Sequence, residues 1–220
     1  MTDEIFSEVY GHDEVKELFR LSLKSEKPIH ILLVGPPASG KTLFLMALER
    51  LPLKVKYYVG SNTSKAGLTE VLLREKPDVL LLDEIEKMKG DDFSALLSLM
   101  ETGRVVRCKY RLWNEEQLNT KVYGACNRTD RMPPELLSRF LVVEFKPYSR
   151  EEFIQVARHV LIVREGLAED EAELIADLLA DSTRDVRDAV KAARLYRVGA
   201  RIDLIKRFFR RRSSHQRTLF

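Results

Sequence analysis

The chain has 220 residues, of which 45% are hydrophobic and 32% are charged. This balance is typical of a globular protein and excludes disordered and collagen-like chains. No apolar run reaches the roughly 20 residues of a membrane helix, and the acidic start lacks the features of a secretion signal. The two cysteines, Cys108 and Cys126, form no metal-type pair. We therefore expect a protein of a reduced intracellular compartment, the cytoplasm.

The net charge of +3 hides an asymmetry along the chain. From residue 191 to the end, the sequence has ten Lys and Arg residues but only one acid, Asp203. The preceding part of the chain is therefore acidic overall. A basic segment on an acidic body favours a polyanionic partner. The alternative is that these charges only solvate the end of a helix.

Five apolar runs alternate with helical stretches, a pattern typical of a parallel α/β sheet. Several runs are almost continuously apolar, as strands covered on both faces should be. We therefore predict the α/β class, with a five-stranded parallel sheet flanked by helices. The predicted strands are residues 29–34, 55–59, 79–82, 121–126 and 141–145.

From near Pro147 onwards, the spacing of the apolar residues becomes that of helices. Ser149 and Glu152 form a capping-box pattern that predicts a helix through Val163. Further helices are predicted over residues 169–180, 184–197 and 202–211. The predicted domains are an α/β domain over residues 1–147, a small all-α lid over residues 148–205 and a basic tail over residues 206–220.

The turn after the first predicted strand carries the P-loop pattern G-x-x-x-x-G-K-[ST]. It precedes a predicted helix over residues 43–50, which is the context that such a loop requires. Its glycines let backbone N–H groups turn towards phosphates, and the helix N-terminus adds partial positive charge. We expect Lys41 to reach the β- and γ-phosphates of ATP and the Thr42 hydroxyl to ligate Mg²⁺. The predicted phosphate-binding residues are Gly35, Pro36, Pro37, Ala38, Ser39, Gly40, Lys41, Thr42 and Leu43.

A strand that ends in two carboxylates follows the P-loop. The run Val79-Leu-Leu-Leu-Asp83-Glu84 puts both acids at the carboxyl end of a parallel strand. One acid there can organise the metal while the other acts as general base. We therefore predict Asp83 as a Mg²⁺ ligand and Glu84 as the base that activates water.

These motifs resemble the AAA+ ATPases over nearly the whole chain. By that resemblance, Asn127 after the fourth predicted strand is sensor 1, which helps to place the lytic water. Arg139, in Pro-Glu-Leu-Leu-Ser-Arg-Phe, lies where the family carries its arginine finger. Arg184, in Ser-Thr-Arg-Asp-Val-Arg, lies where sensor 2 opens a lid helix. The resemblance also implies that adenine packs on Val9, Tyr10 and Gly11.

Each of these polar residues has an ordinary alternative. Asn127 could simply end a strand, Arg139 could be a surface arginine, and Arg184 could form an ion pair at a helix start. If Arg139 is a finger, it reaches the nucleotide of a neighbouring subunit, and a supplied arginine is worth about 10³ to 10⁵ in rate in a related system. The resemblance therefore implies a homo-oligomeric ring, by default a hexamer.

An insertion between the acid pair and Asn127 indicates the branch of the family. We predict a helix over residues 92–101, a strand over 104–112, a turn over 113–119 and a return at Thr120. This resembles the pre-sensor-1 β-hairpin division. Period two places three cations on one face of the first strand, where they could follow DNA phosphates or protect an edge strand from aggregation. These cations are Arg107, Lys109 and Arg111.

The overall spacing resembles the ATPase core of the bacterial Holliday-junction branch-migration motors, without their winged-helix domain. Tyr57-Tyr58-Val59-Gly60 also resembles the pore loop of protein unfoldases, but it falls on the second predicted strand. Without a winged-helix domain, DNA contacts are expected from the hairpin, from the basic tail or from a partner protein. The last residues resemble a peptide that docks on the sliding clamp. The tail cations are Lys206, Arg207, Arg210, Arg211 and Arg212, and the clamp peptide comprises Gln216, Leu219 and Phe220.

Three functions fit this sequence. The first is a DNA-linked ATPase, a motor or remodeller in DNA repair and recombination. The second is a MoxR-type chaperone that uses ATP to remodel a protein partner. The third is a regulatory module in which hydrolysis only resets the assembled state.

Overall fold

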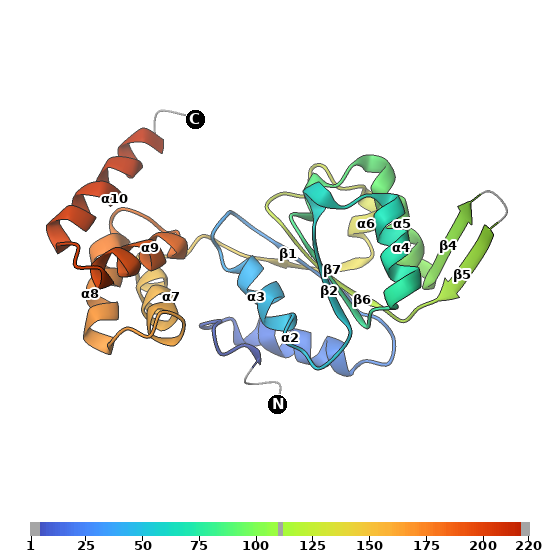
Figure 1. The fold of residues 1–220 in the computed structure, drawn as a ribbon, viewed down its shortest axis with the longest axis horizontal. Coiled ribbons are helices and arrows are strands. Elements are labelled where there is room, and N and C mark those ends of the chain that lie inside the picture. Colours follow the sequence, from blue (N-terminus) through green and yellow to red (C-terminus); the bar gives the residue numbers. More distant parts are fainter. Residues whose placement is uncertain (1–4, 110–111, 217–220) are drawn as a thin grey trace. The chain divides into compact units, whose positions relative to one another are not determined.

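The computed structural model describes residues 5–109 and 112–216, and Figure 1 shows their arrangement. The chain divides into two compact units. The α/β unit consists mainly of Asp13–Pro36 and Lys41–Phe145, and the helical unit of Ser7–His12, Pro37–Gly40 and the residues from Lys146 onwards.

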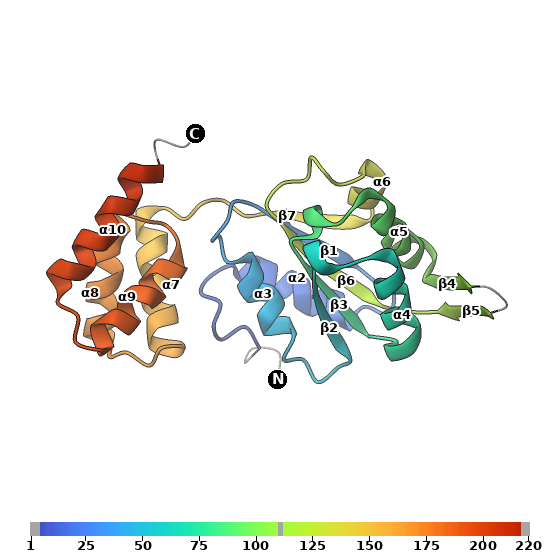
Figure 2. The same ribbon diagram turned by 45° about the horizontal axis from the view of Figure 1, so that its top comes forward.

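A five-stranded parallel sheet, in the order β2-β3-β6-β1-β7, forms the centre of the α/β unit (Figure 2). The three central strands are almost entirely buried, which explains their continuous apolar runs. The predicted sheet is confirmed, and the strand ends differ from the prediction by at most one residue. The strands are β1 (His30–Val34), β2 (Val55–Val59), β3 (Val79–Asp83), β6 (Lys121–Cys126) and β7 (Phe140–Glu144).

Helices cover both faces of this sheet (Figures 1 and 2). On one face Phe19 and Phe44 stack with ring centroids 5.8 Å apart, and Phe19 meets Tyr123 edge-on at 5.0 Å. On the other face Leu72 and Leu96 are fully buried in a cluster with the leucines of β3. The helices are α2 (Asp13–Lys24) and α3 (Lys41–Leu48) on the first face, and α4 (Lys65–Glu75), α5 (Phe93–Thr102) and the short α6 (Pro134–Leu137) elsewhere in the unit.

A separate hairpin of β4 (Arg104–Lys109) and β5 (Leu112–Gln117) projects away from the sheet (Figure 1). The hairpin insertion was expected, but the predicted turn over residues 113–119 is wrong, because β5 already begins at Leu112. The polar run of β5 is a strand because its acids meet cations. Arg104 Nε donates to Glu115 Oε1 at 2.7 Å, and Lys76 Nζ lies 2.8 Å from Glu116 Oε1.

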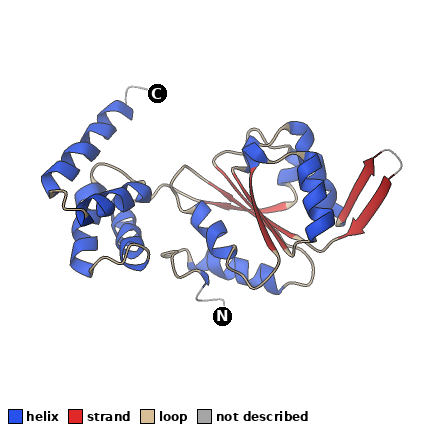
Figure 3. Cartoon of the chain, viewed as in Figure 1, coloured by secondary structure: helices blue, strands red, loops and turns tan. Residues whose placement is uncertain are grey.

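The helical unit contains α7 (Arg150–Val163), α8 (Glu169–Ala180), α9 (Val186–Arg197) and α10 (Ile202–Gln216), with no strand among its described residues (Figure 3). The predicted capping box is confirmed, since Ser149 accepts from the Glu152 N–H while Glu152 accepts from the Ser149 N–H. None of the described helices is long and apolar enough to cross a membrane.

Two predicted helix limits in this unit are wrong. The third helix begins at Val186 and not at residue 184, because Asp185 is its N-cap and accepts from the Arg187 N–H. The last helix continues to Gln216 instead of ending at residue 211. Phe209, which is 7% exposed, packs into the same core as α7 and α8, so the boundary drawn between residues 205 and 206 falls within one helix.

Candidate active site

The predicted phosphate loop connects β1 to α3. Gly40 has φ +90° and Ala38 has φ +64°, so the loop uses the left-handed region twice. A Cβ atom at Gly35 would lie 2.3 Å from the carbonyl oxygen of Phe145. The sequence pattern thus matches a local backbone requirement, and the N-terminus of α3 follows the loop directly, an arrangement that favours anions.

Lys41 is 6% exposed and lies inside this loop. Its Nζ donates to the carbonyl oxygens of Gly35 and Pro36 at 2.8 and 2.7 Å and to Asn127 Oδ1 at 3.3 Å. A buried ammonium among neutral oxygen acceptors attracts anions. The loop therefore fits a phosphate group, with positive charge where the pattern predicts it.

Asp83, the last residue of β3, gathers three donors. Its Oδ2 accepts from the Thr42 and Tyr57 hydroxyls, each at 2.9 Å, and its Oδ1 accepts from the Glu84 N–H at 2.9 Å. Burial raises the pKa of Tyr57, with Asp83 next in effect, so this hydroxyl stays a donor. Carboxylate and hydroxyl oxygens are ligands that Mg²⁺ prefers, usually one or two from the protein. The pair Thr42 and Asp83 therefore fits Mg²⁺.

Glu84 has a left-handed backbone, with φ 51° and ψ 40°. Gly60, which follows β2, allows this conformation, because a Cβ atom there would lie 2.2 Å from the Glu84 carbonyl oxygen. The Glu84 side chain is ion-paired, with Oε1 2.7 Å from Lys87 Nζ. The hydrogen bond to Glu84 raises the pKa of Lys87. Left-handed geometry at a non-glycine residue is frequent at functional sites.

Asn127 directly follows β6, and its side chain faces Lys41 as noted above. Its main-chain N–H donates to Glu86 Oε1 at 2.9 Å. Glu86 belongs to the 3₁₀ turn η2 (Ile85–Lys87), next to the acid pair. The structure thus brings together four of the predicted residues: Lys41, Thr42, Asp83 and Asn127.

The sequence interpretation missed three residues of this cluster. Glu86 and Lys87 follow the acid pair directly, which was a usable signal. Tyr57 was considered only as part of a pore-loop motif. In the sheet, Tyr57 pairs with Leu81, and Val59 pairs with Asp83. Because residues two apart on a strand share a face, Tyr57 lies on the same face of the sheet as Asp83.

Arg139 lies between α6 and β7 and is ion-paired within its own chain. Its Nη2 lies 2.7 Å from Glu101 Oε1, and its side chain is 39% exposed. A half-exposed ion pair of this kind contributes little stability and exchanges readily. The finger role stays a prediction.

Within the helical unit, the segment predicted to contact adenine packs on α7. Val9 is buried, whereas Tyr10 is 41% exposed, with its ring centroid 5.5 Å from that of His159. A His159 nitrogen lies 2.6 Å from the Ser7 carbonyl oxygen. Gly11 has φ +65°. The Ser7 contact and the buried Val9 thus anchor the segment on the N-terminal side of its half-exposed aromatic ring.

Tyr148 joins the phosphate loop to the start of the lid within the same unit. Its hydroxyl donates to the Ser39 carbonyl oxygen at 3.1 Å. A Cβ atom at Gly40 would lie 2.6 Å from that hydroxyl, so glycine is required here for space as well as for its φ.

Arg184 does not open a helix, because α9 begins two residues later, at Val186. Its guanidinium donates to the carbonyl oxygens of Ala180 and Thr183 and lies 6.0 Å from the centroid of the Phe153 ring. Arg187, three residues later, pairs with Asp185, with Nη2 2.8 Å from Oδ2. Whether Arg184 meets a phosphate stays a prediction.

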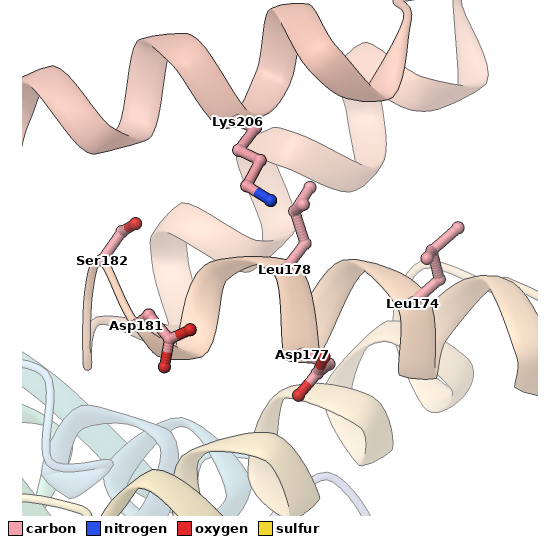
Figure 4. Close-up of a pocket in the computed structure, with 6 residues that line it drawn as sticks. All are labelled: Leu174, Asp177, Leu178, Asp181, Ser182 and Lys206. Atoms are coloured by element: carbon pink, nitrogen blue, oxygen red, sulfur yellow. The ribbon is translucent and has the colours of Figure 1, made fainter.

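The predicted DNA and clamp residues are described only in part. Arg107 is half-buried on β4 and Arg207 is exposed on α10. Lys206 lines a small pocket of the helical unit with Leu174, Asp177, Leu178, Asp181 and Ser182 (Figure 4). Arg111, Leu219 and Phe220 lie outside the described residues, as do the side chains of Lys109, Arg210, Arg211, Arg212 and Gln216.

A phosphate loop at the end of the first strand, with a strand-end acid two strands away, defines a P-loop nucleoside triphosphatase. Residues 31–148, more than half of the chain, match the model of the family described as "ATPase family associated with various cellular activities (AAA)". The chain belongs to this AAA family, and its activity is that of an ATP hydrolase. The predicted family, nucleotide binding and enzyme class are thereby confirmed.

The fold is similar to that of the RuvB Holliday junction branch migration motor of Thermotoga maritima. The TM-score is 0.66 at 23% sequence identity, over 89% of this chain and 67% of that chain. This similarity confirms the fold class.

Two curated relatives come from different functional groups. The minichromosome maintenance protein MCM of Saccharolobus solfataricus is 28% identical over 199 residues, which are 72% of this chain and 29% of that protein. The Lon protease of Rickettsia bellii is 26% identical over 210 residues, 80% of this chain and 27% of that protein. The chain thus spans less than a third of these relatives.

Proposed function

We propose that this chain is the ATPase core of an oligomeric ring that couples ATP hydrolysis to the remodelling of DNA or of a DNA-bound complex. The observation that carries the proposal is a set of two hydrogen-bonded pairs at the phosphate loop. Lys41 donates to Asn127 at 3.3 Å, and the next residue, Thr42, donates to Asp83 at 2.9 Å. The MCM and RuvB similarities, together with cations on the hairpin and α10, favour DNA as the substrate.

In this proposal the phosphate loop and Lys41 bind the phosphates of ATP, and Val9, Tyr10 and Gly11 contact adenine. Thr42 and Asp83 would hold Mg²⁺, which when bound neutralises charge on the phosphates. Glu84 accepts a proton from the water whose oxygen attacks the γ-phosphorus. The bond to the bridging oxygen then breaks, and ADP leaves.

For Glu84 to act as the base, its carboxylate must be free of Lys87. For Arg139 to stabilise charge on a neighbour's nucleotide, its guanidinium must leave Glu101. Both are half-exposed ion pairs, which contribute little stability and exchange readily. Arg184 would sense the γ-phosphate from the lid over residues 148–205. We propose a hexamer, because the finger role requires a subunit neighbour.

DNA contacts are proposed for the hairpin and for the basic end of α10, and a clamp contact for the last residues. The Lon similarity supports a second function, the ATP-driven remodelling of a protein by a MoxR-type chaperone.

The test is the ATPase rate as a function of protein concentration, with and without a four-way DNA junction at low salt. We expect a steep rise with concentration and further stimulation by the junction, which added salt abolishes. A rate that depends on concentration but not on DNA would shift the substrate to a protein. A concentration-independent rate would refute the shared active site.

A further inference from the structure

Glu86 provides an unusual connection at the end of the central strand. The sheet ladder ends at Cys126, which pairs with Val34 and whose carbonyl accepts from the Gly35 N–H at 3.2 Å. The next N–H, that of Asn127, has no strand partner. Glu86 Oε1 accepts it at 2.9 Å, across 41 residues of sequence. A carboxylate therefore replaces the missing rung of the ladder, and charge-assisted bonds of this type are about twice as strong as neutral ones.

The second oxygen of the Glu86 carboxylate, Oε2, indicates that the residue does not serve mainly to stabilise the fold. Glu86 Oε2 is buried and has no hydrogen-bond partner within the described part of the chain. A buried polar atom without a partner costs about 1 to 3 kcal/mol, and more when it is charged. A residue that is costly for folding and adjacent to an active site indicates a functional constraint.

The surroundings of Glu86 belong to the active site. Burial raises the pKa of the Cys126 thiol to about 12, the negative charge of Glu86 adds to that rise, and Lys41 opposes it. The charges of Glu86 and Lys41 therefore both act on the Cys126 thiol. Asn127, held by Glu86 through its main chain, accepts from Lys41 Nζ through its side chain at 3.3 Å. One chain of contacts runs from η2 through the end of β6 to the phosphate loop.

We propose that Glu86 is a positioning residue for ATP hydrolysis, which fixes the main chain of Asn127 so that its side-chain amide faces Lys41 and the phosphates. The inference rests on the proposed role of Asn127. Glu86 itself contacts no reacting atom in this arrangement. Its loss should lower kcat and leave nucleotide affinity unchanged, because Lys41 and the loop backbone remain in place.

The experiment compares Glu86→Ala, Glu86→Gln, Asn127→Ala and the double variant Glu86→Ala/Asn127→Ala in the full chain. A fluorescent ADP analogue reports binding and folding, and steady-state assays separate kcat from KM. Outer-shell residues that orient a functional group typically contribute about 10- to 100-fold. We therefore expect Glu86→Ala to lose about that factor in kcat with unchanged ADP affinity. Glu86→Gln, which retains the acceptor, should stay within about threefold of wild type.

The double variant distinguishes positioning from an independent effect. If Glu86 acts through Asn127, the double variant is no slower than Asn127→Ala alone. Losses that multiply would overturn the proposal, as would a Glu86→Ala variant that hydrolyses ATP normally while Asn127→Ala does not. A fully active Asn127→Ala would remove the sensor role and this inference together, and a Glu84→Gln variant without turnover would still support the proposed ATPase mechanism.

Glu165→Ala is the matched control. Glu165 is a carboxylate with a 9% exposed side chain in the helical unit, paired with Arg194 at 2.9 Å. Its removal also breaks a carboxylate contact, but it should leave kcat unchanged. An equal loss of kcat in this control would mean that general destabilisation explains the effect.

Discussion

Substitution of Gly60 by alanine tests whether the left-handed conformation of Glu84 depends on the neighbouring strand. The added Cβ would lie 2.2 Å from the Glu84 carbonyl oxygen and 3.1 Å from the Ile85 Cα. Ordinary contact begins near 3.4 Å, so one backbone must move by about 1 Å, and a 1 Å misplacement of a catalytic group can cost about 100-fold in rate. Overpacking of this kind also costs about 1 to 3 kcal/mol of stability.

The assay for Gly60→Ala is kcat together with the affinity for ADP. We expect kcat to fall by about 100-fold and ADP affinity to change little, because the atoms nearest to the added Cβ belong to Glu84 and Ile85 and not to the phosphate loop. Gly90→Ala is the matched control, since a Cβ at Gly90 has no atom within 4 Å. A folded Gly60→Ala variant with kcat within twofold of wild type would refute the dependence of Glu84 on Gly60.

Three further predictions concern single groups. Tyr57→Phe removes one of the donors to Asp83 and should raise the Mg²⁺ concentration needed for ADP binding by about tenfold. A Mg²⁺ titration in the presence of fluorescent ADP would measure this change. An unchanged titration midpoint would contradict a role of Tyr57 in the metal site. Arg139→Ala should bind ATP normally but lose hydrolysis in the assembled state. Glu101→Ala, which removes the ion-pair partner of Arg139, should hydrolyse ATP at least as fast as wild type. An active Arg139→Ala variant would exclude the finger role. Burial lowers the pKa of His30 to about 4, and its Nδ1 accepts from the Val122 N–H at 3.0 Å. Because the unfolded chain binds this proton first, the free energy of unfolding should fall by about 2 to 3 kcal/mol as the pH drops from 6.5 towards 4, as denaturant titrations would show. His30→Gln should remove most of that slope, and an unchanged slope would exclude His30 as its source.

Much of the fold was predictable because buried parallel strands leave continuous apolar runs. β2 and β6 were predicted with their observed limits, and the capping box at Ser149 marked the start of α7. The hairpin was misread because Glu115 and Glu116 look like turn residues in isolation. Only pairing with Arg104 and Lys76, which the sequence does not display, makes a strand of that segment.

The site was predictable where chemistry depends on local spacing. Lys41 and Thr42 occupy fixed places in the loop, and Asp83 ends a strand. Glu86 depends instead on a hydrogen bond across 41 residues, and local spacing carries no signal of such a bond. Arg184 was placed at a helix start because the Asp185 N-cap, one residue later, was not recognised.

The bonds of Lys41 to the carbonyl oxygens of Gly35 and Pro36 affect the choice of reference mutants. A lysine that holds its own loop together has two tasks, shaping the loop before any ligand arrives and then attracting the ligand. Replacing it would change both at once, so a Lys41 variant is a poor stand-in for the nucleotide-free protein. Glu84→Gln, which leaves the loop and its lysine intact, would isolate the chemical step more cleanly.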